Sequence, residues 1–328
     1  GLYPPGSTIK TLTALSALEN DIVSSKLIVK CEGFVDLHGE RFHCWKKKGH
    51  GVVGMRTALK KSCDVYFYEV ARRLGIDKLS VTAKKFGLGQ KVLKNFKEEK
   101  AGVVPDTKWK KRELGNNWYL GETLHSGIGQ GYFLTTPLQL SLMTAQIANG
   151  GFKINPRILV DKNDKVGNLQ NYLNHKNATP GNVMSTNDQI YNFNLQPLFR
   201  NQENINLVKD AMFAATNEAG GTSYRSRFKD KKFMFAGKTG SSQIKRFTKE
   251  QREAETKQKD ITYLERDHAW FVAFAPVQEP KYAISVLVEH GGSGSSAAAP
   301  IAKKIVKAVI ERHKIREEQK KQQSGKNI

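Results

Sequence analysis

The sequence predicts an α+β fold with an antiparallel sheet flanked by helices, and three observations lead to this prediction. Apolar residues recur at helical spacing along much of the first two thirds of the chain. The last third carries two short apolar runs, Trp270–Ala275 and Ala283–Val288, joined by a proline-containing connection that is typical of a hairpin. Helices that come first and strands that come last favour α+β over an alternating order of strands and helices.

The N-terminal elements follow from the spacing of apolar residues. Residues 7–20 are expected to form a helix, because Ile9 and three leucines recur at helical spacing after two prolines and a glycine. Residues 31–54 are rich in Gly, His, Lys and aromatic residues and are expected to form a loop. The helical pattern returns over residues 55–74, which we expect to be one continuous helix.

The later elements follow in the same way. Residues 127–150 predict a glycine-rich turn and then a helix that begins at Pro137. A helix is expected near residues 204–219, before a Gly-Gly pair, and a short apolar strand over Phe233–Gly237. Residues Ala297–Arg312 predict a final amphipathic helix.

These elements predict one domain over residues 1–312, followed by a basic polar tail over 313–328. Two segments are expected to be irregular surface excursions: the Asn-rich residues 161–205 and the highly charged residues 245–267. The chain begins with Gly1 and has neither a basic n-region nor an apolar h-region, so no signal peptide is expected. We expect the sequence to be a piece of a longer chain.

Composition and charge exclude several classes of protein. The chain has 328 residues, and 39% of them are hydrophobic, which is enough for a sizeable core. It has no apolar stretch of the ~18 residues that a membrane-spanning helix needs. Lys and Arg number 53 and Asp and Glu number 31, which gives a formal net charge of +22. The composition leaves a basic enzyme or a protein that binds something acidic.

Two short motifs place a hydroxyl near amines. Ser7 and Lys10 form S-x-x-K at a helix start, where residues three apart share a face. A lysine whose pKa is lowered by burial or nearby cations can take the proton of a serine, and the N–H groups of a helix start suit an oxyanion. Lys238, Thr239 and Gly240 form K-T-G at the end of a predicted strand. They supply a cation and a hydroxyl for a carboxylate, and a glycine that permits close approach of a substrate backbone.

A third motif, Ser62-Cys63-Asp64, lies between these two in the sequence. It is an S-x-D variant of the S-x-N element. The set S-x-x-K, S-D-N and K-T-G is the signature of penicillin-binding proteins and class A β-lactamases. Each motif alone is weak evidence, but all three occur here in the right order and on the expected elements. Together they predict acyl transfer through a serine.

Six segments carry a resemblance to a known family: Tyr3–Lys10, Cys44–Gly51, Ser62–Tyr68, Gly127–Gly131, Ala236–Gly240 and Asp267–Pro276. On these residues the chain resembles the transpeptidase domains of the penicillin-binding protein 2 family, the class B enzymes of bacterial cell elongation. The resemblance implies the serine β-lactamase and penicillin-binding-protein transpeptidase fold, with a mostly helical subdomain. It also implies that a membrane anchor, a pedestal and a first strand precede this sequence, so that the enzyme faces the periplasm from the inner membrane.

The resemblance implies a catalytic role for five motif residues. Ser7 would be the acylated nucleophile and Lys10 its general base. Ser62 would relay a proton beside Lys238. Asp64 would take the place of the amide in the S-x-N element, although a carboxylate there changes the local charge.

The resemblance also implies how substrate is held and what it is. Thr239 and Ser241, with Gly240 between them, would hold the terminal carboxylate of the donor peptide. The backbone N–H groups of Ser7 and Ser241 would form the oxyanion hole, and no cofactor is expected for catalysis. The substrates would be peptidoglycan stem peptides, mimicked by β-lactams. The partners would be a glycosyltransferase of the SEDS type and scaffold proteins of the elongasome.

The three cysteines of the chain and one histidine suggest a metal site made of Cys31, Cys44, His50 and Cys63. Thiolates and an imidazole suit tetrahedral zinc, and four protein ligands leave no open position, so the role would be structural. The resemblance supports zinc in this region. Because one of these ligands lies inside S-x-D, the metal would tie the loop at residues 31–54 to the catalytic wall.

The sequence leaves other pairings open for these side chains. A Cys31–Cys44 disulfide with Cys63 buried and free is the main alternative. His38 and His43 are alternative ligands.

The predicted activity is D,D-transpeptidation in cell elongation. Ser7 attacks the penultimate D-Ala carbonyl, the terminal D-Ala leaves, and an amine of a neighbouring stem resolves the acyl-enzyme. A β-lactamase or a penicillin-sensing domain would share the acylation step, but the sequence shows no second base for fast deacylation. Only the net charge suggests a nucleic-acid binder. That charge is dispersed and no nucleic-acid motif occurs, so no nucleic-acid partner is expected.

Overall fold

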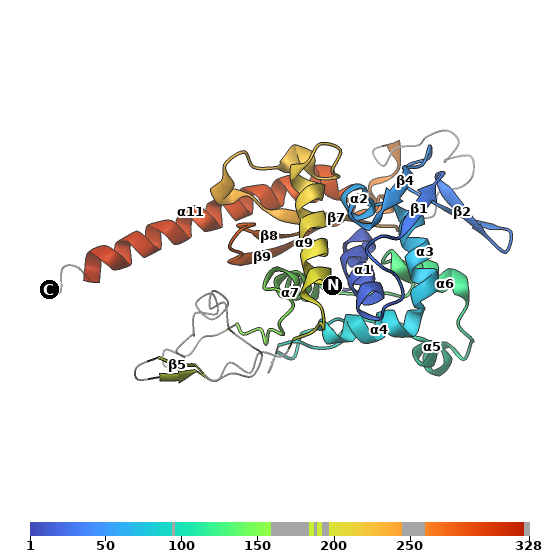
Figure 1. Ribbon diagram of the computed structural model, residues 1–328, viewed down its shortest axis with the longest axis horizontal. Coiled ribbons are helices and arrows are strands. Elements are labelled where there is room, and N and C mark those ends of the chain that lie inside the picture. Colours follow the sequence, from blue (N-terminus) through green and yellow to red (C-terminus); the bar gives the residue numbers. More distant parts are fainter. Residues whose placement is uncertain (94–95, 159–183, 187–188, 192–196, 245–259, 325–328) are drawn as a thin grey trace.

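The computed structural model describes residues 1–328 except 94–95, 159–183, 187–188, 192–196, 245–259 and 325–328 (Figure 1). Most of the predicted Asn-rich excursion and of the predicted charged excursion therefore lies outside the described residues. Among the described residues, no helix has both the length and the apolar character needed to cross a membrane.

Helices are the main regular secondary structure of the described residues. In chain order they are α1 Lys10–Glu19, α2 Met55–Lys61, α3 Asp64–Leu74, α4 Ile76–Lys85, α5 Thr107–Leu114, α6 Leu120–Gly127, α7 Pro137–Ala148, α9 Gln202–Asn217 and α11 Ala299–Ser324. Short 3₁₀ turns are η1 Gly6–Ile9, η2 Tyr224–Ser226, η3 Lys231–Phe233 and η5 Tyr263–Glu265, and η6 Gly294–Ala298 is a π-helical turn.

Three of the predicted helices are present, and the last of them is longer than predicted. Residues 7–20 are helical as expected, although their first turn is the 3₁₀ turn η1. The helix predicted at Pro137 is α7, and the Thr136 side chain caps it by accepting a hydrogen bond from the N–H of Gln139. The C-terminal helix does not end at Arg312, because α11 continues to Ser324.

Three antiparallel strands form the main sheet in the order β7–β8–β9 (Figure 1). β7 covers Ala236–Ser242, β8 covers His268–Ala275 and β9 covers Tyr282–Val288. The hairpin predicted from the last third is confirmed. The strand predicted over Phe233–Gly237 was placed too early, because Phe233 is the last residue of η3 and the strand itself begins at Ala236 and runs on through the K-T-G motif.

The side chains of β8 alternate between two cores, because successive residues of a strand point to opposite faces. Trp270 and Phe274 belong to the larger core, which also contains the apolar residues of α1, α3 and α7. Phe271 and Ala273 belong to a smaller core, which contains Val306 of α11. The sheet is therefore covered on both faces, by α11 on one side and by the other helices on the other.

The segment predicted as a loop over residues 31–54 contains two antiparallel pairs of strands. β1 (Ile28–Cys31) pairs with β4 (Gly51–Gly54), and β2 (Phe34–Leu37) pairs with β3 (Glu40–His43). A two-residue turn closes β2 onto β3, with positive φ values of 49° at His38 and 83° at Gly39. Two positive φ values in a row match the hairpin turn whose twist fits the flanking strands.

The single helix predicted over residues 55–74 is broken into α2 and α3. Ser62 adopts the left-handed conformation, with φ 55° and ψ 43°, and ends α2. The N–H of Cys63 then bonds back to the carbonyl of Ala58 at 2.9 Å, which satisfies a free carbonyl of the helix end. A new helix begins at Asp64. The break places the S-x-D motif between two helices rather than within one.

Candidate active site

Ser7 lies on the turn η1, which two glycines hold against the main sheet. Gly6 has φ +54°, and a Cβ built on it would lie 2.5 Å from the carbonyl oxygen of Ser241 in β7. Its N–H donates to the carbonyl of Gly129 at 2.9 Å, and a Cβ on Gly129 would lie 2.1 Å from the Gly6 oxygen. Only residues without a side chain permit this approach. Ser7 itself stays half-buried.

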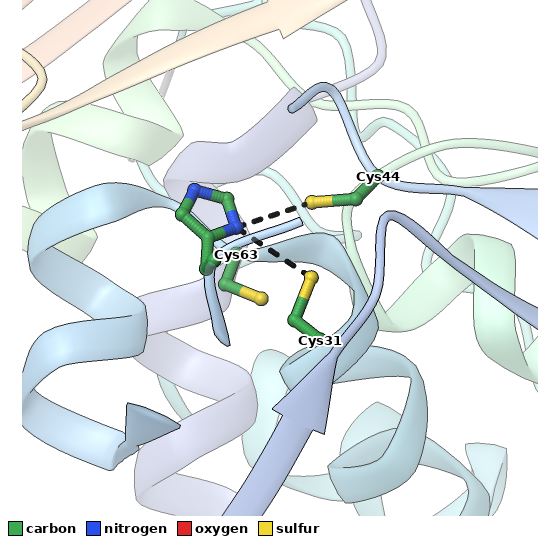
Figure 2. Close-up of side chains that lie close together, drawn as sticks. Cys31, Cys44 and Cys63 are labelled. Atoms are coloured by element: carbon green, nitrogen blue, oxygen red, sulfur yellow. Dashed lines mark hydrogen bonds between the residues drawn. The ribbon is translucent and has the colours of Figure 1, made fainter. Parts of the chain in front are cut away.

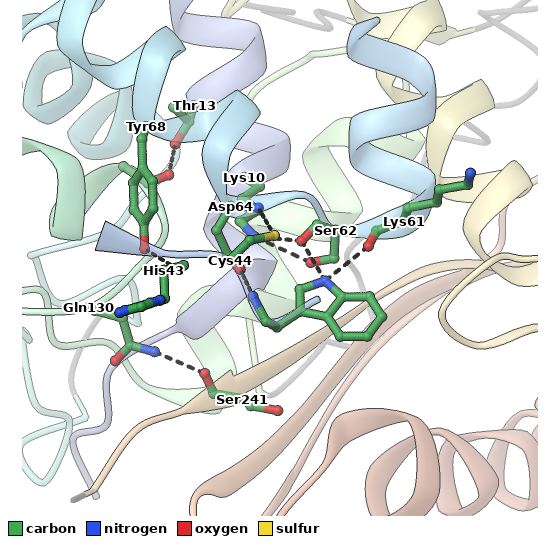
Figure 3. A network of polar contacts seen from close by, with 12 residues as sticks. Lys10, Thr13, His43, Cys44, Lys61, Ser62, Asp64, Tyr68, Gln130 and Ser241 are labelled. Carbon is green, nitrogen blue, oxygen red and sulfur yellow. Dashed lines mark hydrogen bonds and ion pairs between the residues drawn. The ribbon is translucent and has the colours of Figure 1, made fainter. Parts of the chain in front are cut away.

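Lys10 follows one helical turn after Ser7 and is fully buried. Its ammonium group donates to the carboxylate of Asp64 at 2.6 Å and to the carbonyl of Ser62 at 3.0 Å, and it lies 3.4 Å from the Ser62 hydroxyl (Figure 3). Within the described part of the chain, the Ser7 hydroxyl makes no hydrogen bond with Lys10. The direct Ser7–Lys10 contact expected from the sequence is therefore replaced by a contact with the S-x-D motif.

Lys238 approaches the same serine from β7. Its ammonium group donates to the Ser62 hydroxyl at 2.8 Å and to the carbonyl of Thr239 at 2.9 Å, and its side chain is fully buried. Burial lowers the pKa of Lys238 well below its ordinary value, and the charge of Lys10 lowers it further. The Ser62 hydroxyl thus lies between two buried amines, one of which is readily deprotonated.

Asp64 anchors this arrangement. It is buried, and burial raises its pKa, while the Lys10 charge and the Trp45 N–H oppose the rise. The N–H of Trp45 donates to its second oxygen at 2.8 Å, and the Trp45 indole donates to the Ser62 carbonyl at 3.0 Å. Trp45 was not among the predicted site residues. Its position directly after Cys44 was the available signal.

β7 forms the opposite wall. Thr239 is buried, and its hydroxyl donates to that of Thr222 at 2.9 Å. The side-chain amide of Gln130 donates to the Ser241 carbonyl at 3.0 Å (Figure 3). A Cβ on Gly240 would lie 3.0 Å from the Thr8 side chain, so the close approach at this glycine is made by the chain's own first turn.

The depressed pKa of Lys238 predicts a pH dependence of stability. Between that lowered value and the ordinary value of 10.5, the unfolded chain binds more protons than the folded chain. The free energy of unfolding should therefore rise with pH across this window. Denaturant unfolding from about pH 7 to about pH 10 should show this rise in the wild type and a flatter curve in Lys238→Met. Parallel curves for the two proteins would contradict the prediction.

The four predicted metal ligands come together beside the S-x-D motif. The ligand atoms of Cys31, Cys44, His50 and Cys63 all lie within 4.8 Å of one another (Figure 2). The Nδ1 atom of His50 lies 3.5 Å from the Cys44 sulfur and 3.7 Å from the Cys31 sulfur. All three cysteines are free and buried, so the alternative disulfide does not form. His38 and His43, the alternative ligands, are outside this cluster.

The cluster fits a tetrahedral zinc ion. Zinc–sulfur bonds of ~2.3 Å in a tetrahedron put the ligand atoms roughly 3.8 Å apart, which agrees with the spread of this set. The contact with Cys63 lowers the pKa of Cys44, and the contact with Cys44 together with burial raises the pKa of Cys63. The fold therefore favours a thiolate among these sulfurs before any ion binds. The N–H of Asp64 also donates to the Cys44 sulfur at 3.4 Å, which joins the cluster to the S-x-D motif.

Comparison with known proteins points to the same family as the three motifs. A family model of the penicillin-binding protein transpeptidase domain matches residues 1–307. A peptidoglycan D,D-transpeptidase MrdA of Acinetobacter baumannii is 35% identical over 306 residues, which is 92% of this chain and 42% of that protein. The MrdA of Escherichia coli is 31% identical over 296 residues, 90% of this chain and 43% of the relative. The chain spans less than half the length of these curated relatives.

Solved structures show the same likeness. A complex of the penicillin-binding protein PBP2 with MreC from Helicobacter pylori matches with a TM-score of 0.76 and 32% identity, over 95% of this chain and 50% of that one. PBP2 of Pseudomonas aeruginosa in complex with WCK 5153 matches with a TM-score of 0.73 and 32% identity, over 94% of this chain and 61% of that one. These matches confirm the predicted fold. The chain belongs to the penicillin-binding protein transpeptidase domain family.

Proposed function

We propose that this chain is the catalytic domain of a peptidoglycan D,D-transpeptidase of cell elongation and a target of penicillins. The observation that carries the proposal is the convergence of three motifs on one hydroxyl: Lys10 from S-x-x-K and Lys238 from K-T-G both reach Ser62 of S-x-D. The names of the MrdA relatives support the activity. We propose residues 1–312 as this domain, an extent close to the family match.

In the proposed reaction the Ser7 oxygen attacks the carbonyl carbon of the penultimate D-Ala. Lys10, in its neutral amine form, accepts the Ser7 proton. That proton then passes through Ser62, beside Lys238, to the departing amine. The peptide C–N bond breaks, D-Ala leaves, and an ester to Ser7 remains. An amine of a second stem then attacks the ester, forms the cross-link and returns Ser7 to its hydroxyl form. Asp64 holds Lys10 in place through the 2.6 Å ion pair.

Substrate would be held by the β7 wall. Thr239 and Ser241 would bind the terminal carboxylate of the donor, while Gly240 lets β7 pass close to η1. The backbone N–H groups of Ser7 and Ser241 would stabilise the developing oxyanion, which is the largest single contribution in many acyl-transfer enzymes.

The lifetime of the acyl-enzyme tests this function. Wild-type protein mixed with a penicillin should gain the mass of one adduct and keep it for many minutes, because the sequence supplies no second base to activate water. The same protein should release D-Ala from a stem pentapeptide and join the remainder to an added amine acceptor. Mass spectrometry follows both reactions. An adduct that hydrolyses within seconds would identify a β-lactamase instead.

We also propose that Cys31, Cys44, His50 and Cys63 hold one structural zinc ion. All four positions would be taken by protein, so the ion would supply no catalytic chemistry. It would fix the paired strands β1 and β4 against Cys63, which lies between Ser62 and Asp64 of S-x-D. The metal would thus set the position of the catalytic wall.

Elemental analysis tests the zinc proposal. We expect one zinc ion per chain in the wild type and none in Cys31→Ser, which removes a ligand from β1 without touching S-x-D. Removal of the ion with a strong chelator should lower the melting temperature, because metal binding and folding are coupled. His43→Ala is the matched control, since this histidine lies outside the cluster. Retention of zinc in Cys31→Ser would refute the proposed ligand set.

The cellular setting is proposed from the relatives. The structural relative from Helicobacter pylori is a complex with MreC. We propose that this chain works at the periplasmic face of the inner membrane, through an anchor outside this sequence. Its partners there would be a SEDS-type glycosyltransferase and elongasome scaffold proteins, and it would bind no nucleic acid.

A further inference from the structure

A groove runs along the first turns of α11. It has a volume of about 680 Å³ and lies between the residues that follow α9 and the start of α11. The loop after α9 and α11 lie side by side in Figure 1. Thr222 lines one end of the groove, and its hydroxyl accepts the 2.9 Å hydrogen bond from Thr239. The groove therefore begins next to a residue that we propose to bind the donor peptide.

Four cationic side chains line this groove, and none of the described residues that line it is acidic. Lys303 and Lys304 come four and three residues before Lys307, so each lies next to Lys307 on the surface of α11. Arg225 contributes from the opposite wall. Within the described part of the chain, Arg225 and Lys304 take part in no ion pair. Two strong donors are therefore available to an anion.

The other two lysines have local partners but keep donors to spare. The Lys303 amine donates to the carbonyl of Arg227 at 3.0 Å, which uses one of its three protons. The Lys307 amine lies 3.8 Å from the carboxylate of Glu311, and both side chains are about half exposed, so this pair is weak. The groove thus keeps a net positive charge along its length.

The remaining lining suits a peptide rather than an isolated ion. Phe228 and Pro300 provide apolar surface, and Ser226, Ser295 and Ser296 provide hydroxyls. The helix rises by about 10 Å from Pro300 to Lys307. That length corresponds to roughly three extended residues. A short peptide with carboxylates would therefore find apolar contacts, hydroxyls and cations in one groove.

We propose that this groove binds a carboxylate-bearing peptidoglycan stem peptide and extends the substrate site beyond Ser7. The inference rests on the proposed function, because that function makes stem peptides the ligands of the neighbouring β7 wall. Stem peptides carry free carboxylates besides the terminal one, and these match the cations of Arg225 and Lys304. The continuity with Thr239 favours a peptide over a lipid surface, which would need no connection to the catalytic strand.

Charge reversal tests the groove. The double variant Arg225→Glu, Lys304→Glu should raise the KM for a stem pentapeptide about tenfold, or lower the use of a stem peptide as acceptor to the same extent. Its acylation rate with a small penicillin should stay within about twofold of the wild type, because penicillin covers only the Ser7 end. Lys229→Glu, an exposed charge reversal outside the groove lining, is the matched control and should leave all three measurements unchanged.

The outcomes separate the possible ligands and separate this inference from the proposed function. A raised donor KM assigns the groove to the donor stem, and a reduced acceptor reaction assigns it to the acceptor stem. Unchanged peptide kinetics overturn the inference, as does a loss confined to binding of phosphatidylglycerol vesicles. If the wild type forms no penicillin adduct, the proposed function fails. Direct titration of the pentapeptide against wild type and double variant then decides the groove separately.

Discussion

Ser7→Ala is expected to abolish the covalent penicillin adduct and the release of D-Ala. The loss should reach roughly four orders of magnitude or more, as in serine enzymes that lose their nucleophile. Ser62 cannot substitute for it, because its hydroxyl is buried and held by Lys238 at 2.8 Å. The fold should be unaffected, since the Ser7 hydroxyl makes no hydrogen bond with the described residues.

Two measurements make this result specific. Labelling with a fluorescent penicillin should be absent in Ser7→Ala and unchanged in Ser25→Ala, which changes an exposed serine outside the three motifs. The free energy of unfolding of Ser7→Ala should lie within about 0.5 kcal/mol of the wild type. A stable adduct on the Ser7→Ala chain would remove Ser7 as the nucleophile and with it the proposed mechanism.

Asp64→Ala is expected to lower the free energy of unfolding by about 3–5 kcal/mol, because it leaves the charge of a buried lysine without a partner. Lys10 is fully buried and 2.6 Å from the Asp64 carboxylate. The same change leaves the Trp45 N–H without its acceptor. Urea unfolding monitored by circular dichroism measures the loss. Acylation by penicillin should fall as well, since Lys10 loses the group that positions it.

Matched variants distinguish charge pairing from simple loss of packing. Asp64→Asn keeps an oxygen that can accept from Lys10 and should lose much less stability than Asp64→Ala. The double variant Lys10→Met, Asp64→Ala removes both charges and should recover part of the loss, although it cannot acylate. If the double variant recovers none of the loss, the unpaired charge of Lys10 is not the cause.

The helices were predictable because their signals are local. Pro137 after a capping threonine marks the start of α7, and the Gly-Gly pair after α9 marks its end. The break at Ser62 was not predictable, because Leu59 and Tyr66 keep helical spacing across it and a non-glycine residue with positive φ gives no local signal. The true extent of β7 was also hidden, since Lys238, Thr239 and the residues after them are not a typical strand sequence. Pairing with β8 determines that strand.

The motifs of the site and the grouping of its cysteine and histidine residues were predictable. Ser62, Lys10 and Lys238 do converge, and the side chains of Cys31, Cys44, His50 and Cys63 do cluster. The contacts between motifs could not be read from spacing. That Asp64 pairs with Lys10, and that Trp45 joins both halves of S-x-D, depends on how separate segments pack. Such long-range contacts follow from tertiary structure, which a single sequence does not display.

Under the proposed function, the paired glycines beside Ser7 limit how resistance to penicillins could arise. Any side chain at Gly6 or Gly129 would overlap backbone atoms of another segment, at 2.5 Å and 2.1 Å respectively. Backbone cannot move aside as a flexible side chain can, so these two positions are closed to gradual change. Under the proposed function, substitutions that weaken penicillin binding while preserving transpeptidation would therefore have to arise at positions other than these two glycines.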